Sequence, residues 1–349
     1  MAKRVFVSGI VILFMMVGII SLEAPAAQSA SGGEIKIDFS CTAAPGSVLD
    51  LATVEFKTIV EKKSRGRISV TLYRHGALYD PKGEIEAIAR AGLAMAVLSM
   101  SHVGGRSAAL EFIGGLGAQG CWADRDHYWK FTDLPETRRI ARSEFEAKIN
   151  AKLLSLLSYG PGIIGNSKRP IHTVGDYNGL KVRAAGSAQA SLYKALGMVP
   201  TELSAKEVYM ALQRGTIDGA SSGPDRFFKS KWYEVTKYLT QDDAVPGVSM
   251  WLAINLDFWD KLSQQDQLIL AETARDLEKW TRTYSIKETE EAYEKLRPLV
   301  KDFYFFPKSE VAKINEIAGP TMHNLIVKRA GKEMGDELWT LLLDAKSSR

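Results

Sequence analysis

The stretch from residue 175 to residue 239 constrains the fold most, because it alternates short apolar strands with amphipathic helices. Within it, Leu180 and Val182 alternate with charged neighbours, which is the period of a strand with one face on a core. Strand–helix units joined by short loops predict a parallel sheet, and such sheets bind ligands at the carboxyl ends of their strands. Arg183 follows at the end of the first strand. The stretch therefore predicts an α/β fold with a cation where a ligand would bind.

Capping residues and glycines mark the elements of this stretch. Ser187 is a candidate N-cap for the first helix, which Gly197 would end in a left-handed conformation. Ser204 and Glu207 stand three residues apart, the spacing of a capping box that opens a second helix. A final strand is expected at 217–220. The predicted order is strand, helix, strand, helix, strand.

Outside this stretch, apolar periodicity predicts further elements. Strands are expected at 34–40, 67–73, 95–100 and 250–255, and helices at 49–63, 85–91 and 131–157. Residues 158–165 are expected to form a first crossing between two domains. Ser263 and Asp266 open a long helical pattern that continues to Leu296. Such a helix would span roughly 50 Å, which is more than one small domain needs.

Composition indicates a folded protein of about two domains. The 349 residues are 46% hydrophobic and 25% charged, and the net charge of +4 is too small to indicate nucleic-acid binding. Residues 1–30 combine Lys3 and Arg4 with an apolar run and small residues, which is typical of a signal peptide; an uncleaved anchor is the alternative. After export, Cys41 and Cys121 could form one disulfide or stay free, and spacing does not decide between the two.

Four phrases in register resemble the extracytoplasmic solute-binding proteins of TRAP transporters, the tripartite carriers of organic acids. They are DYNGLKVR at 176–183, YKALGMVPT at 193–201, KEVYMALQRGTIDGA at 206–220 and KWYEVTKYL at 231–239. Looser similarity extends over nearly all of 34–340.

The resemblance implies a two-lobed periplasmic binding protein of α/β class, with a hinge cleft and a long helix that braces both lobes. The expected division is a signal peptide at 1–30, lobe I at 31–158 plus 248–290, and lobe II at 159–247 plus 291–349. It also implies periplasmic localisation, TRAP membrane permease subunits as partners and no enzymatic activity. A monomer is expected.

Arg183 is the main candidate for ligand binding, because the resemblance implies that the arginine of the GLKxR phrase holds the substrate carboxylate. A guanidinium offers a planar fork for two charge-assisted hydrogen bonds. A solvated arginine at a strand end is the alternative from periodicity alone.

The chain also departs from the family pattern. No cation stands at 162–165, where many members carry a second arginine, and Ser221 and Ser222 replace a glutamate and an asparagine of a conserved turn. That turn also lacks the acidic residue and tryptophan of metal-dependent members, so no metal and no cofactor are expected. A phenylalanine common in the family is Ala205. These losses of bulk and polarity favour a monocarboxylate, of aromatic or alicyclic kind, over a C4-dicarboxylate.

Other candidates have a structural alternative of similar weight. Ser101 and His102 follow a buried strand and would meet a ligand or only solvent. Tyr159 and Trp251 flank the crossing segments and would stack on a ligand or fill the core. Ser221 and Ser222 would donate hydrogen bonds or serve turn chemistry. Asp225 and Arg226 are expected to pair at the surface.

Residues 115–120 match G-x-G-x-x-G, but the strand and helix that a dinucleotide site requires are not predicted around them. No hydrolase or metalloprotease motif is present either. The expected function is therefore capture of an organic acid by hinge closure and delivery to the permease. A C4-dicarboxylate binder or a ligand sensor for a receptor kinase are the alternatives.

Overall fold

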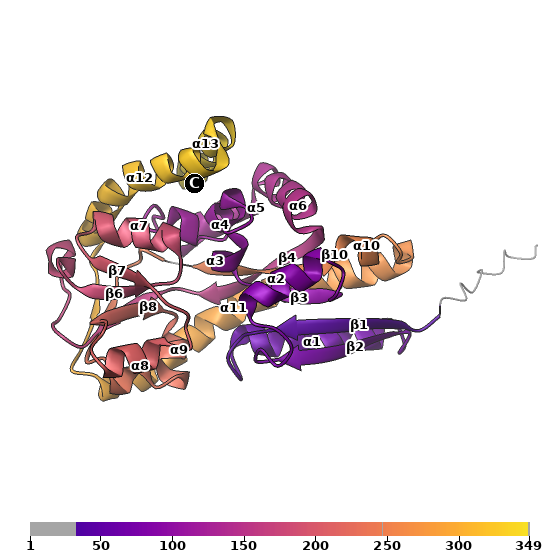
Figure 1. Ribbon diagram of the computed structural model, residues 1–349, viewed down its shortest axis with the longest axis horizontal. Coiled ribbons are helices and arrows are strands. Elements are labelled where there is room, and N and C mark those ends of the chain that lie inside the picture. The colour runs from indigo at the N-terminus through magenta and orange to yellow at the C-terminus, as the bar shows by residue number, and fades with distance from the viewer. Residues whose placement is uncertain (1–32, 246, 348–349) are drawn as a thin grey trace, which may run out of the picture. The chain divides into compact units, whose positions relative to one another are not determined.

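Two β-sheets organise the residues that the computed structural model describes, 33–245 and 247–347 (Figure 1). Residues from Glu34 onwards form one compact unit. The predicted signal peptide at 1–30 lies outside the described residues. The α/β class expected from the sequence is confirmed.

The first sheet is built mainly from the N-terminal part of the chain. Its strand order is β2 (Ile68–Arg74), β1 (Ile35–Cys41), β3 (Met95–Leu98), β10 (Val248–Asn255) and β4 (Ala151–Gly160). β1 runs parallel to β2 and β3, whereas β10 runs antiparallel to β3 and β4. The helices α1 (Val48–Lys63) and α2 (Pro81–Ala89) connect the first three strands. The expected return of the chain at 250–255 is confirmed, since β10 lies between two strands of this sheet.

The second sheet contains the stretch that dominates the sequence. Its order is β11 (Asp302–Phe305), β9 (Tyr238–Gln241), β5 (Ile163–Asn166), β8 (Gly219–Ser222), β6 (Lys181–Ala184) and β7 (Val199–Glu202). β6 pairs in parallel with β7 and β8, and α7 (Ser187–Ala195) and α8 (Val208–Gln213) join these strands. The predicted strand–helix alternation and its parallel pairing are confirmed.

Two of the segments that join the sheets lie side by side. β4 ends at Gly160 and β5 begins at Ile163, so Pro161 and Gly162 make the first crossing. The Gly162 N–H donates to the Val245 carbonyl, 2.8 Å away, on the returning segment. The two crossings are therefore hydrogen-bonded side by side, as a hinge between lobes requires.

One long helix contacts both halves of the molecule. α11 (Gln264–Leu296) has 33 residues, with Ser263 as its N-cap. It packs against α1 and β4 of the first sheet and against α9 (Pro224–Lys229) beside the second. Near the crossing, the Ser158 N–H donates to Thr281 Oγ1 at 3.0 Å. The bracing helix expected from the sequence is confirmed.

The remaining helices lie on the sheets and on one another. They are α3 (Met100–Val103), α4 (Ala108–Ile113), α5 (Arg125–Asp133), α6 (Pro135–Ile149), α10 (Leu256–Trp259), α12 (Lys308–Ala330) and α13 (Lys332–Ser347). α12 and α13, yellow in Figure 1, pack together; α12 also contacts α7, and α13 contacts α5, α4 and α6. The lobe boundaries stay a prediction. The prediction assigns α13 to lobe II with residues 291–349, but α13 contacts three helices that lie within the residues assigned to lobe I.

Three local expectations were wrong. The helix expected at 131–157 ends at Ile149, because Asn150 is left-handed (φ 54°) and the apolar residues after it enter β4. Ser187 is not a cap: Gly186 takes the N-cap position, so Ser187 is already the first helical residue. The strand expected at 217–220 is β8, shifted to Gly219–Ser222.

Cys41 and Cys121 are both free and buried, so the structure favours the alternative without a disulfide. Burial raises the pKa of each thiol to about 12.

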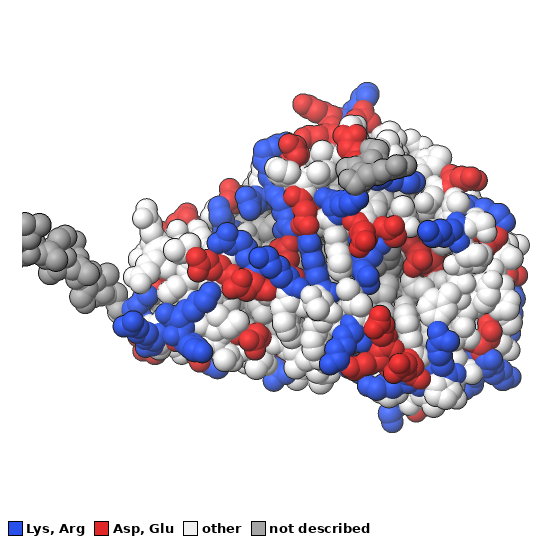
Figure 2. Space-filling view, turned by 180° about the vertical axis from the view of Figure 1, so that it is seen from behind, with Lys and Arg blue, Asp and Glu red and all other residues white. Residues whose placement is uncertain are grey.

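Within the described part of the chain, no helix is long and apolar enough to cross a membrane, and no group of three or more acidic, His or Cys side chains could hold a metal ion. On the face shown in Figure 2, basic and acidic side chains are interspersed.

Candidate functional site

Arg183 is a buried cation at the end of β6. Its side chain is only 8% exposed. Nε donates to the Leu203 carbonyl at 2.8 Å, and Nη1 donates to the Ser221 carbonyl at 3.3 Å. Burial lowers the pKa of Arg183 to about 10, so it remains positively charged at neutral pH. Among the described residues it forms no ion pair, which leaves part of its guanidinium fork for an external anion.

A polar network surrounds this arginine. The Tyr193 hydroxyl on α7 interacts by hydrogen bonds with Ser221 and with Gln119. Gln189 Nε2 donates to Gln119 Oε1 at 3.0 Å, and both amides are almost fully buried. Burial raises the pKa of Tyr193, so its hydroxyl stays protonated and able to donate. Uncharged donors next to a buried cation suit a carboxylate.

Tyr193, Gln189 and Gln119 were not among the site residues predicted from the sequence. Gln189 and Tyr193 lie four residues apart on α7 and therefore share one face of the helix. That spacing was a usable signal. Gln119 follows a short 3₁₀ turn (Leu116–Ala118) between α4 and α5, within the G-x-G-x-x-G match. The match thus lies between two helices, without the strand that a dinucleotide site requires.

Tyr159 and Arg226 form a second part of the neighbourhood. Tyr159 is the last residue but one of β4, beside the crossing, and its hydroxyl is hydrogen-bonded to the Arg226 guanidinium on α9. The positive charge of Arg226 also lowers the pKa of Arg183, after the larger effect of burial. The expected surface pair of Asp225 and Arg226 was wrong, because Asp225 is only 4% exposed and its Oδ2 has no hydrogen-bond partner.

Ser101 and His102 reach the same neighbourhood from the first sheet. They lie on α3, not in a loop as expected. A Cβ placed on Gly186, just after β6, would lie 3.7 Å from the Ser101 Cβ. The pKa of His102 is lowered by burial and, to a smaller extent, by the charge of Arg183. Elements of both sheets therefore meet around Arg183.

The two remaining predicted residues differ in position. Ser222 is half-buried at the end of β8, one residue after Ser221. Trp251 is fully buried in β10, where its ring centroid lies 5.2 Å from that of Phe145. This placement favours a core role for Trp251.

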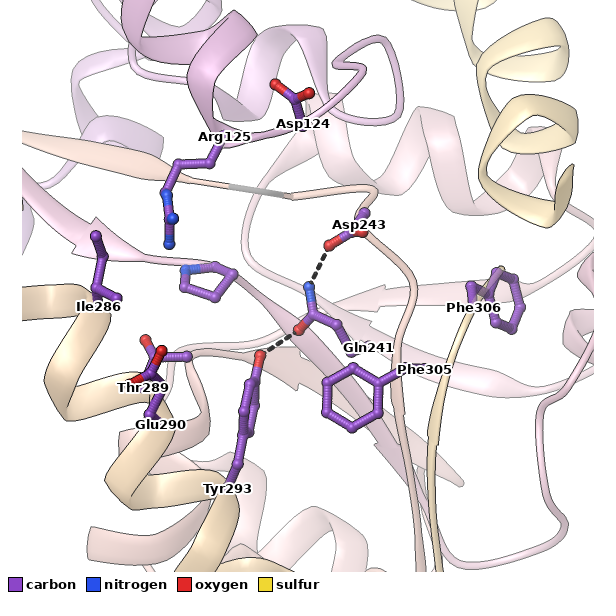
Figure 3. Close-up of a pocket in the computed structure, with 11 residues that line it drawn as sticks. Asp124, Arg125, Gln241, Asp243, Ile286, Thr289, Glu290, Tyr293, Phe305 and Phe306 are labelled. Carbon is purple, nitrogen blue, oxygen red and sulfur yellow. Dashed lines mark hydrogen bonds between the residues drawn. The ribbon is translucent and has the colours of Figure 1, made fainter. Parts of the chain in front are cut away.

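A separate cavity of about 300 Å³ contains none of the predicted site residues (Figure 3). Arg125 projects into it from α5 towards Ile286 of α11, and Gln241 connects Tyr293 with Asp243 through hydrogen bonds of 2.6 and 2.7 Å. Its charged lining is Asp124, Arg125, Asp243 and Glu290. Three carboxylates against one guanidinium do not suit an anion, so Arg183 remains the better carboxylate site.

A fold of two sheets joined by paired crossings, with a buried arginine at the end of β6 that forms no ion pair among the described residues, is the arrangement expected of a solute-binding protein. Residues 39–328 match the family model of the bacterial extracellular solute-binding proteins, family 7 (DctP). The chain therefore belongs to this family, whose members bind solutes and are not enzymes. The resemblance to TRAP solute-binding proteins is confirmed.

Relatives of known name support this assignment. The chain is 26% identical over 332 residues to the C4-dicarboxylate-binding periplasmic protein DctP of Rhodobacter capsulatus, covering 92% of this chain and 95% of that protein. A TRAP periplasmic solute-binding protein of Desulfovibrio salexigens with bound orotic acid has the same fold, with a TM-score of 0.81, 18% identity, and coverage of 89% of this chain and 98% of that one. The sugar acid binding protein of Advenella mimigardefordensis in complex with galactonate gives a TM-score of 0.77, 22% identity, and coverage of 90% and 99%.

Proposed function

We propose that this protein captures an organic acid in the periplasm, by closure of two lobes around Arg183, and delivers it to the membrane permease subunits of a TRAP transporter. The observation that carries the proposal is a buried guanidinium that has no carboxylate partner among the described residues. A buried cation is costly unless a counter-charge joins it, so the ligand carboxylate would complete the site. A monomer is part of the same proposal.

Ligand binding and closure are coupled in this proposal. Arg183, Ser221 and Tyr193 belong to the second sheet and its helix, whereas Ser101 and Gln119 come from segments beside the first sheet. A ligand shifts the protein towards the closed state only if it contacts both groups there. The named relatives bind a C4-dicarboxylate, orotic acid and galactonate, all of which are acids.

The finer proposal concerns the class of acid. The segment 162–165 supplies no cation, and Ser221 and Ser222 present only small hydroxyl side chains. We infer a bulkier monocarboxylate, of aromatic or alicyclic kind. Tight binding of malate, fumarate and succinate without binding of ring acids would contradict this.

A thermal-shift screen of residues 31–349 tests the proposal, because a ligand that binds only the folded state raises the melting temperature. The probes are aliphatic, aromatic and alicyclic mono- and dicarboxylates, with a neutral amide of each as control. Calorimetry on Arg183→Ala and Arg183→Lys should show about 100-fold weaker binding for the alanine variant, since two charge-assisted hydrogen bonds are lost.

Arg214→Ala is the matched control, because Arg214 is exposed at the end of α8. It removes one positive charge outside the site and should leave affinity within twofold of wild type. Binding of neutral or cationic compounds alone, or equal affinity of wild type and Arg183→Ala for an acid, would overturn the role of Arg183.

A further inference from the structure

Arg226 is a second cation in the neighbourhood of Arg183, because Arg183 Nη1 donates to the Ser221 carbonyl near the end of β8 and α9, which carries Arg226, begins at Pro224. It lies on α9, is half-buried and, among the described residues, forms no ion pair within 4 Å. The positive charge of Arg226 lowers the pKa of Arg183. Two like charges in one partly desolvated region repel each other. The arrangement therefore leaves a surplus of positive charge that the chain does not neutralise by direct pairing.

Tyr159 holds this arginine in place. The phenol hydroxyl is hydrogen-bonded to the guanidinium of Arg226. The ring lies so close to Gly223 that a Cβ there would approach its Cε1 to 3.2 Å and its Cζ to 3.4 Å. The φ of Gly223 is −63°, so the backbone itself does not require glycine. A small residue at 223 lets the ring of Tyr159 lie against the start of α9 and orient Arg226.

Asp225 does not neutralise Arg226 by direct contact. Among the described residues, its buried Oδ2 has no hydrogen-bond partner. The same oxygen lies 4.0 Å from Lys229 Nζ, and no ion pair joins Asp225 to Arg226. Burial raises the pKa of Asp225, and the charge of Asp225 raises the pKa of Arg226 less than the contact with Tyr159 does. The nearest acid on α9 thus leaves the guanidinium of Arg226 available for a ligand.

Arg183 can hold one carboxylate without help from Arg226. A guanidinium carries five N–H donors, and the protein uses one on Nε and one on Nη1 of Arg183. The three that remain suffice for a bidentate carboxylate. Arg226 is therefore free to bind a different group of the same ligand.

We propose that Arg226 is a specificity-determining cation that selects acids with a second oxygen acceptor, namely a hydroxyl, carbonyl or carboxyl group, in addition to the carboxylate held by Arg183. The inference rests on the proposed function. It predicts that the protein discriminates between acids of one skeleton by the presence of the second oxygen.

Matched acids test this. Calorimetry would compare benzoate with the three hydroxybenzoates and the three benzenedicarboxylates, cyclohexanecarboxylate with quinate, and cyclohex-1-enecarboxylate with shikimate. For wild type, we expect at least one oxygenated member to bind tenfold or more tightly than its parent acid. In Arg226→Gln and Arg226→Ala this ratio should fall below about threefold, whereas the affinity for the parent acid should change less than twofold. Arg226→Lys, which keeps the charge, should retain part of the ratio.

Each other outcome separates the inference from the proposed function. If the Arg226 variants weaken parent and oxygenated acids equally, Arg226 shares the first carboxylate or supports the fold, and the inference fails. If wild type binds the acids without preference, or the variants keep its preference, the inference fails while the function stands. If no acid binds wild type, the proposed function itself fails. Arg214→Ala again controls for net charge, and circular dichroism confirms that each variant is folded.

Discussion

Lys229 on α9 and Glu288 on α11 form an ion pair of 2.5 Å that also connects to the other half of the molecule. The same Lys229 Nζ donates to the Gly46 carbonyl at 2.9 Å, in the loop after β1. Glu288 in turn accepts from the Val48 N–H, at the start of α1, at 3.3 Å. One ion pair therefore ties the helix that carries Arg226 to the loops of the first sheet.

Replacing Lys229 by methionine should weaken ligand binding about three- to tenfold. These bonds join the loop after β1 to α9 and α11, and under the proposed closure such contacts between the two halves stabilise the ligand-bound state. The loss corresponds to roughly 1 kcal/mol, as for a partly exposed, charge-assisted hydrogen bond. Calorimetry with an acid from the screen measures it.

Lys287→Met is the control for this variant. Lys287 lies on α11 as well, but its side chain is 73% exposed and, of the residues the structure describes, pairs only with Glu291, 3.8 Å away. The Lys287→Met variant should bind the acid with the affinity of wild type. Unchanged affinity in Lys229→Met would show that the ion pair does not contribute to closure.

Gly223→Ala should disturb the position of Tyr159. The added Cβ would lie 2.7 Å from Asp225 Oδ1 and 3.2 Å from Tyr159 Cε1, so at least one side chain must move. We expect destabilisation of about 1–2 kcal/mol, as for overpacking of a core, together with weaker discrimination between oxygenated and parent acids. Thermal unfolding and the calorimetric comparison measure the two effects.

Gly175→Ala is the matched control, since a Cβ there has no neighbour closer than 3.7 Å and φ is not positive. It should change neither stability nor discrimination by a comparable amount. Wild-type behaviour of Gly223→Ala would mean that the contact between Tyr159 and α9 tolerates an extra methyl group.

The sequence predicted those features that repeat or persist along the chain. The alternation of apolar residues around Val182 predicted β6, and the long helical pattern after Ser263 predicted α11. Arg183 was the main candidate because it ends a strand of the parallel sheet and stands in the GLKxR phrase of the family resemblance, and its role in ligand binding stays a prediction. Each of these signals lies within one continuous segment.

The features that sequence did not predict depend on contacts between distant segments. The apolar run that begins at Ala151 suits a buried helix as well as a buried strand, and only pairing with β10 makes it β4. Gln119 and Gln189 meet because the 3₁₀ turn Leu116–Ala118 packs against α7, and the local sequence of neither segment encodes this contact. Arg226 followed a turn and was expected at the surface, since nothing in its neighbours reports the approach of Tyr159.

Glu84 should make stability depend on pH. It lies on α2 and is fully buried, and its Oε1 accepts from Ser40 Oγ at 2.7 Å, whereas Oε2 has no hydrogen-bond partner within the described part of the chain. Burial raises the pKa of Glu84 from 4.5 to about 8. The folded protein therefore binds this proton more tightly than the unfolded chain, so stability falls as pH rises from 4.5 to 8 and the penalty is complete above pH 8.

Glu84→Gln should remove this dependence, because glutamine is neutral at every pH and keeps a carbonyl acceptor for Ser40. We expect similar unfolding free energies for variant and wild type at pH 4.5, and a variant more stable by about 2 kcal/mol or more at pH 9. Urea unfolding at pH 4.5, 7 and 9 measures the difference, in which the titration of other groups cancels. A difference that stays constant across this range would show that Glu84 does not bind a proton on folding.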